Sequence, residues 1–209
     1  MNKSTTILVH GFNVKDGGIA TVQTMEKHFK ALSNEVVFNW NYGHFNLMNV
    51  IFQNKKVAKK IKDYVGKIEA GKSIYAVGHS NGCAILVNSA RQGARYDKLL
   101  LINPALKVDT VFPKNIGQII VVHTNNDKPT NVAGILDKIP FLCLAIPNAW
   151  GAMGKVGYQG KDKRVTNLDM TSVLKGHSDF FSGKNNHLKN LMVHAVLNST
   201  LPRELGKFM

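Results

Sequence analysis

The alternation of short extended runs with helical segments is the feature of this sequence that most limits its fold. Runs rich in apolar and β-branched residues cover residues 6–9, 35–40, 73–77, 98–102, 118–123 and 165–168. Apolar residues recur at helical intervals over residues 19–32, 57–68, 83–94 and 186–198. Strands that alternate with helices form parallel sheets covered on both faces. The sequence therefore predicts an α/β fold with a mostly parallel central sheet and helices on both faces.

A length of 209 residues fits one domain of this class, and 44% hydrophobic residues suffice for a core. The sequence shows no internal repeat, low-complexity segment or linker. We therefore expect residues 1–209 to form a single domain.

The segment Gly78-His79-Ser80-Asn81-Gly82 matches the pattern G-x-S-x-G. It directly follows an extended run and directly precedes a helical pattern, which is the context that gives this motif meaning. A serine at the tip of a sharp strand-to-helix turn takes a strained conformation, and glycine on either side avoids clashes between neighbouring backbones. The pattern indicates a nucleophilic serine, Ser80, lifted out at the start of a helix.

With these residues, the chain resembles the α/β-hydrolase family over nearly its whole length. The resemblance implies a catalytic triad in the order serine, acid, histidine. His177 follows the last extended run, and Asp127 follows the run before it, so they match the base and the acid. The alternatives share these residue types and positions in loops or in the last helix: Asp109, Asp137, Asp162, Asp169, His187 and His194.

The resemblance also implies an oxyanion hole of two backbone N–H groups. One belongs to the residue after the nucleophile, Asn81. The other belongs to the loop that begins with His10-Gly11, and we assign it to Phe12. We expect His10 and His79 to be structural neighbours of the site.

These residues predict a serine hydrolase that cleaves carboxylic esters of small-molecule or lipid-like substrates through an acyl-enzyme. A peptidase or a thioesterase would use the same triad, and a non-catalytic binding protein could share the fold. Residues 131–160 either border the substrate or form an ordinary packed segment. The sequence gives no sign of a metal site or a cofactor.

The formal net charge of +14 attracts anions such as acidic lipid surfaces, charged polymers and nucleic acid. No nucleic-acid module accompanies the charge, which argues against nucleic acid as the main partner. The densest cluster, Lys55, Lys56, Lys59, Lys60 and Lys62, is typical of the solvated face of an amphipathic helix, and an anion site is the alternative. With two cysteines and neither a signal-peptide pattern nor a membrane-length apolar stretch, we expect a cytoplasmic protein.

Overall fold

A computed structural model of the chain contains a six-stranded sheet in which every neighbouring pair of strands is parallel. The structure describes residues 4–12, 16–32, 36–40, 47–128, 150–198 and 200–209. The strand order is β2-β1-β3-β4-β5-β6. The strands are β1 (Thr5–Val9), β2 (Val36–Trp40), β3 (Ile74–His79), β4 (Tyr96–Ile102), β5 (Ile116–His123) and β6 (Val165–Asp169).

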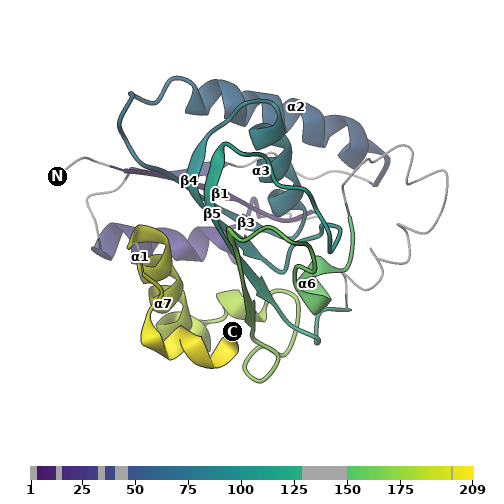
Figure 1. Cartoon of the computed structure of the whole chain (residues 1–209), viewed down its shortest axis with the longest axis vertical. Helices are drawn as coiled ribbons and strands as arrows, with labels where there is room; N and C mark the ends of the chain where they lie inside the picture. Colours follow the sequence, from purple (N-terminus) through teal and green to yellow (C-terminus); the bar gives the residue numbers. More distant parts are fainter. Residues whose placement is uncertain (1–3, 13–15, 33–35, 41–46, 129–149, 199) are drawn as a thin grey trace.

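Helices cover both faces of this sheet, as the sequence predicts (Figure 1). Helices α2 (Leu47–Val65) and α3 (Asn81–Arg91) pack on one face, and α1 (Glu26–Leu32) and α7 (Asn186–Leu197) pack on the other. A short helix, α6 (Met153–Val156), precedes β6. Four 3-10 helices complete the described elements: η1 (Val22–Met25), η2 (Asp179–Phe181), η3 (Gly183–Asn185) and η4 (Arg203–Phe208).

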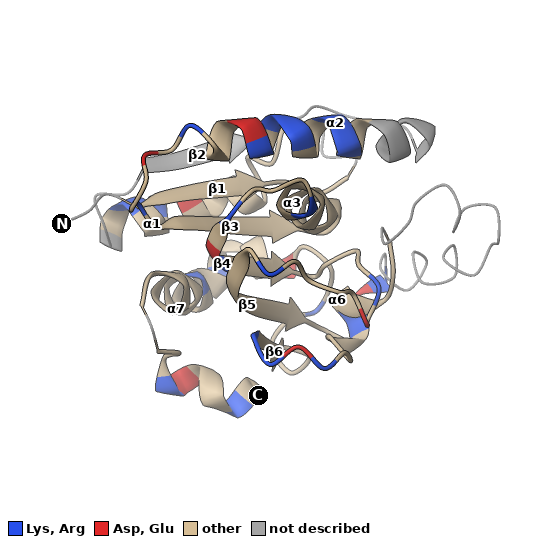
Figure 2. Ribbon diagram, turned by 45° about the horizontal axis from the view of Figure 1, so that its top comes forward, with Lys and Arg blue, Asp and Glu red and all other residues tan. Residues whose placement is uncertain are grey.

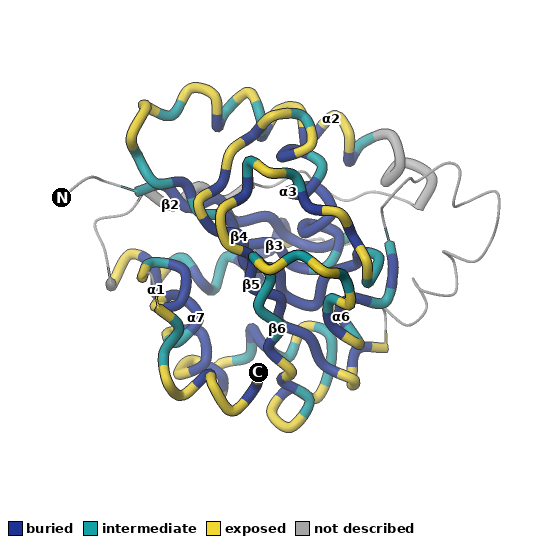
Figure 3. The backbone as a smooth tube through the Cα atoms, in the orientation of Figure 1, coloured by how far each residue is buried: buried dark blue, intermediate teal, exposed yellow. Residues whose placement is uncertain are grey.

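Two hydrophobic clusters separate the sheet from its helices, one on each face. Strand residues alternate between them because successive side chains point to opposite faces. Ile7 and Leu99 belong to the cluster under α2 and α3, whereas Leu8 and Leu100 belong to the cluster under α1 and α7. The central strands are consequently buried from both sides (Figure 3).

The helix predicted over residues 19–32 begins later than expected. Ile19 lies in a turn and is 66% exposed, and helical structure starts only at η1. The Asp16 carboxylate accepts the N–H groups of Gly18 and Ala20 at 2.9 Å and 2.8 Å. Side-chain bonds of this kind compete with helical backbone bonds, so the chain turns before the helix begins.

Because the strands are parallel, their carboxyl ends meet at one edge of the sheet. The turns after β1, β3, β4, β5 and β6 lie at that edge, and they hold the candidate site residues named in the sequence analysis. Functional residues gather at this edge in open parallel sheets. Among the described residues, no helix has both the length and the apolar character needed to cross a membrane.

Candidate active site

Ser80 occupies the turn between β3 and α3 in a backbone conformation that non-glycine residues rarely adopt. Its φ is 53° and its ψ is −122°. Backbone bonds hold it there: its N–H donates to the Ile102 carbonyl at 3.0 Å, and its carbonyl accepts from Cys83 and Ala105. Strain that the surroundings maintain in this way is typical of functional positions. The side chain is thus presented at the tip of the turn at the carboxyl edge of the sheet.

The flanking glycines are required by close backbone contacts. A Cβ on Gly78 would lie 2.8 Å from the Cys83 nitrogen, and one on Gly82 would collide with the carbonyls of Val9 and His10. A Cβ on Gly11 would lie 3.1 Å from the Ser80 Cβ. The loop after β1 therefore passes directly beside the serine, where only glycine leaves room.

Asp127 and His177 form a hydrogen-bonded pair, with His177 Nδ1 at 2.8 Å from Asp127 Oδ2. The Asp127 side chain is fully buried, and that of His177 is 15% exposed. The two loops are also tied together, since the Asn126 amide donates to the Leu174 carbonyl at 2.7 Å. A carboxylate that accepts from Nδ1–H leaves Nε2 as the basic nitrogen of a neutral imidazole.

His79, the residue before the serine, connects it to His177. The two imidazole rings lie 4.7 Å apart between centroids, and His79 Nε2 donates to the His177 carbonyl at 3.2 Å. Burial holds the pKa of His79 well below its ordinary value, and the nearby His177 lowers it further. His79 is therefore neutral. Its contacts with His177 place it beside the candidate site, and His10, predicted with it as a structural neighbour, is also buried.

Asn103 is a site residue that the sequence reasoning missed. It follows β4, is fully buried, and has a φ of 43°. Its amide donates to the same His177 carbonyl that His79 contacts. Two buried donors from two strand ends thus hold the backbone of His177. Its position immediately after an apolar run and before Pro104 was the one available signal.

Phe12 and Asn81, the predicted oxyanion donors, lie at the ends of two elements beside Ser80. Asn81 is the first residue of α3, and Phe12 follows Gly11 after β1. N–H groups at a helix start point out of the helix and carry positive potential. The Phe12 ring lies 5.6 Å from the ring of Trp150.

Sequence reasoning also missed Asn54, and it included Trp150 only as part of the segment 131–160, with no role of its own. Asn54, on α2, forms a reciprocal amide pair with Asn81, and the Trp150 indole N–H donates to the Asn81 side-chain oxygen. No local pattern indicates these contacts, because the partners are 27 and 69 residues apart.

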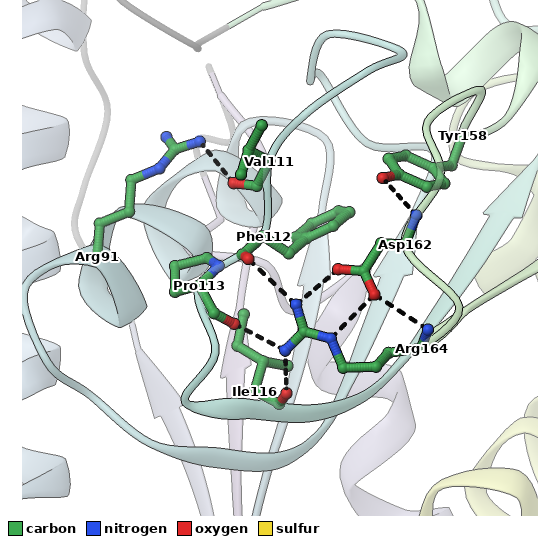
Figure 4. A network of polar contacts seen from close by, with 8 residues as sticks. All are labelled: Arg91, Val111, Phe112, Pro113, Ile116, Tyr158, Asp162 and Arg164. Atoms are coloured by element: carbon green, nitrogen blue, oxygen red, sulfur yellow. Dashed lines mark hydrogen bonds and ion pairs between the residues drawn. The ribbon is translucent and has the colours of Figure 1, made fainter.

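The alternative acids and bases that the structure describes have other partners or are exposed. Asp162 binds Arg164 before the start of β6, at the opposite edge of the sheet (Figure 4). Asp169 bonds to Thr171 and Asp109 is exposed. His187 and His194 are exposed on α7. Asp137 lies outside the described residues, as do residues 131–149 of the segment considered as a substrate border.

Within the described part of the chain, no three or more His, Cys, Asp or Glu side chains cluster in a way that could hold a metal ion. Cys83 is buried in the core, and burial raises the pKa of its thiol.

Comparison with known proteins identifies the fold. Neither a family model nor a curated protein sequence matches the chain. Solved structures do match. One is an extracellular α/β-hydrolase from a Paenibacillus species, with a TM-score of 0.58 and 12% identity over 93% of this chain and 100% of that chain.

Two further matches have the same architecture. A serine hydrolase without a lid from Xanthomonas campestris has a TM-score of 0.58 and 14% identity over 97% of this chain and 85% of its own. Est1E from Butyrivibrio proteoclasticus, solved with ferulic acid bound, has a TM-score of 0.56 and 13% identity over 93% of this chain and 87% of its own. The chain therefore has the α/β-hydrolase fold, as the sequence predicts.

Proposed function

We propose that this chain, which has the α/β-hydrolase fold, is a serine hydrolase that cleaves carboxylic esters through an acyl-enzyme. One observation carries the proposal. The strained Ser80 directly follows His79, and His79 contacts His177, which is itself hydrogen-bonded to the buried Asp127. A nucleophile, a base and an orienting acid are the three groups that serine hydrolases of unrelated folds share.

Acylation follows from the protonation states. The Ser80 hydroxyl is a weak nucleophile at neutral pH, so His177 Nε2 takes its proton as Oγ attacks the ester carbonyl carbon. Asp127 keeps the proton on Nδ1 and stabilises the imidazolium that forms. The tetrahedral intermediate then expels the alcohol, which receives the proton from His177.

Deacylation repeats these roles with water in place of Ser80. His177 takes a proton from water as its oxygen attacks the acyl carbon, and the carboxylic acid leaves when Ser80 regains its proton. In both steps the amides of Phe12 and Asn81 would donate to the negative oxygen. A donor of this kind is typically worth about 3 kcal/mol in the transition state.

Esters are proposed as the substrate class because an alkoxide is easier to expel than the amine of a peptide and needs only the proton that His177 supplies. The serine hydrolase from X. campestris and the ferulic acid bound to Est1E are consistent with that class. The aromatic pair of Phe12 and Trp150 would form an apolar wall beside the acyl group.

Labelling with a fluorophosphonate tests the proposal. The probe should modify one residue, and peptide mass spectrometry should locate it at Ser80. Ser80→Ala should abolish labelling and lower turnover of p-nitrophenyl esters at least about 10⁴-fold, as loss of a nucleophile does. The exposed Ser172→Ala is the control and should label and turn over as the wild type does.

Three results would redirect the proposal. Ester turnover that persists in Ser80→Ala, with circular dichroism indicating a folded variant, would exclude Ser80 as the nucleophile. Labelling at Ser80 together with faster cleavage of thioesters or peptides in a substrate panel would assign the triad to those substrates. A folded wild-type protein that does not react with the probe would favour a non-catalytic binding protein.

A further inference from the structure

Trp150 connects the two residues proposed to form the oxyanion hole. Its indole N–H donates to Asn81 Oδ1 at 3.0 Å, and its ring lies 5.6 Å from the ring of Phe12. Its own backbone is fixed by a bond from its N–H to the Ala105 carbonyl at 3.0 Å. Ala105 in turn donates to the Ser80 carbonyl. Trp150 thus joins the loop after β1 and the start of α3 through its side chain, and the chain beyond β4 through its backbone.

The backbone of Trp150 is strained, with a φ of 64°. Bulky residues rarely adopt this left-handed conformation, and strained residues persist where the surrounding contacts hold them. The Trp150 side chain contacts Asn81 and Phe12, the two residues whose amides are the proposed oxyanion donors. The contacts that hold Trp150 in its strained conformation are therefore also contacts with the proposed oxyanion hole.

The side chain of Asn81 is held from two sides. Its oxygen accepts from Asn54 Nδ2 at 2.8 Å and from Trp150, and its Nδ2 donates to Asn54 Oδ1 at 3.0 Å. Asn54 and Asn81 are 3% and 1% exposed. Both lone pairs of the Asn81 oxygen are thus engaged by buried or half-buried donors, which fixes the orientation of the first residue of α3.

We propose that Trp150 is a positioning residue that holds the Phe12 and Asn81 amides in the geometry of the oxyanion hole, with Asn54 as the second support of Asn81. This inference rests on the proposed function. Preorganised donors act mainly on the transition state, where the charge develops. Loss of their alignment should therefore lower kcat and leave substrate binding nearly unchanged.

Trp150→Phe tests this directly, because it removes the indole N–H and keeps a ring beside Phe12. With a p-nitrophenyl ester, we expect kcat to fall about tenfold, the size of effect typical of a weakened donor, with KM within twofold. Inhibition by an alkyl boronic acid, whose tetrahedral adduct places a negative oxygen in the hole, should weaken by the same factor. The pH profile of kcat/KM should keep its shape, because His177 is not touched.

Asn54→Ala should reproduce this pattern through the other support of Asn81. The double variant should lose less than the product of the single losses, since both changes act on one side chain. Tyr158→Phe is a matched control: it removes one hydrogen bond of an aromatic side chain, the bond from the Asp162 N–H to the hydroxyl, at the far edge of the sheet. Its kcat should equal that of the wild type.

A folded Trp150→Phe with wild-type kcat would overturn the inference. So would a raised KM with unchanged kcat, because Trp150 would then only line the substrate site. These outcomes leave the proposed function standing as long as Ser80→Ala is inactive. Should wild-type protein fail to react with the fluorophosphonate, the proposed function fails first and this inference falls with it.

Discussion

Gly82 lies where the first turn of α3 passes the end of β1, and the residue there can have no side chain. A Cβ would collide with the Val9 carbonyl and lie 2.5 Å from the His10 carbonyl. Both obstacles are backbone atoms of a central strand and its loop, so neither can move without separating α3 from the sheet.

Gly82→Ala is therefore expected to destabilise the protein by about 3 kcal/mol or more, the range of severe core substitutions. Urea unfolding measures this. Gly66→Ala is the matched control, since its Cβ would meet only the Lys62 and Asp63 carbonyls at 3.5 Å and 3.7 Å. That variant should stay within about 0.5 kcal/mol of the wild type. Equal stability of the two variants would contradict the close approach of α3 and β1.

Asn103 contacts His177 through one hydrogen bond, which its side-chain amide donates to the His177 backbone carbonyl. Its buried amide donates to the His177 carbonyl beside His79, and its positive φ keeps the amide in place. Asn103→Ala removes one of the two donors and leaves His79 as the other. The base should then be less well positioned rather than lost.

We expect kcat/KM for a p-nitrophenyl ester to fall about 10- to 100-fold in Asn103→Ala, as misplacement of a catalytic group by a fraction of an ångström does. The rate of fluorophosphonate labelling should fall in parallel. An exposed asparagine of α7, Asn186, provides the control as Asn186→Ala. A labelling rate equal to that of the wild type would mean that Asn103 does not position His177.

At the level of elements, Arg164 joins the start of β6 to the turn that precedes β5 (Figure 4). Its guanidinium pairs with Asp162 at 2.6 Å and donates to the carbonyls of Phe112, Pro113 and Ile116. The Asp162 carboxylate raises the pKa of Arg164, and the Arg164 guanidinium lowers the pKa of Asp162. This network lies at the edge of the sheet opposite the candidate site.

Arg164→Lys should therefore cost stability and spare activity. A lysine cannot match the fork of five donors, so we expect the free energy of unfolding to fall by about 2 kcal/mol. Arg95→Lys is the control, because its pair with Asp97 is exposed and 3.7 Å long, and such pairs contribute little. Thermal unfolding and ester turnover, measured on both variants, separate the two effects. A loss of turnover in folded Arg164→Lys would contradict this assignment.

The sequence predicts the elements well wherever local chemistry decides them. Each of the six extended runs is a strand. The central strands are nearly continuous apolar segments, as buried parallel strands are. The first helix is shorter than predicted, because the Asp16 carboxylate binds the amides that a helix would use. Its apolar spacing alone does not reveal this competition.

The candidate site likewise contains some residues that the sequence can indicate and others that it cannot. Ser80, Asp127 and His177 could be selected because each follows a strand in an order that a known family uses, and Asp127 and His177 do lie within hydrogen-bond distance. Their catalytic roles stay a prediction. Asn54, Asn103 and Trp150 could not be selected, because their contacts join residues 27, 74 and 69 positions apart and depend on the finished fold.

At the scale of the whole molecule, the net charge of +14 is not paired within the chain. The outer face of α2 carries exposed lysines, which Figure 2 shows as blue segments along the helix, with an acidic position near its carboxyl-terminal end. That position is Asp63, which pairs with both Lys59 and Lys62 at 3.5 Å and 3.2 Å. The inner residues Val57 and Ile61 are buried, so the lysines form a solvated face, as the sequence predicts.

The remaining question is whether this face also binds an anionic surface. An exposed lysine near such a surface contributes about 1 kcal/mol, so four lysines on one helix face should dominate binding. We expect the wild type to bind vesicles of phosphatidylcholine with 30% phosphatidylglycerol, and to release them as salt shortens the Debye length. Changing Lys55, Lys56, Lys59 and Lys60 together to glutamate should weaken binding at least about 100-fold.

The control separates a local face from total charge. Changing Lys27, Lys114, Lys161 and Lys163 to glutamate lowers the formal net charge by the same 4 × 2 = 8, from +14 to +6, at exposed positions outside α2. If the α2 face makes the contact, this variant should bind within about threefold of the wild type, because charges beyond a Debye length are screened. If both variants lose vesicle affinity equally, binding depends on the total charge of the protein and not on the α2 face. If the wild type does not bind the vesicles, the α2 lysines form a solvated face and no binding site.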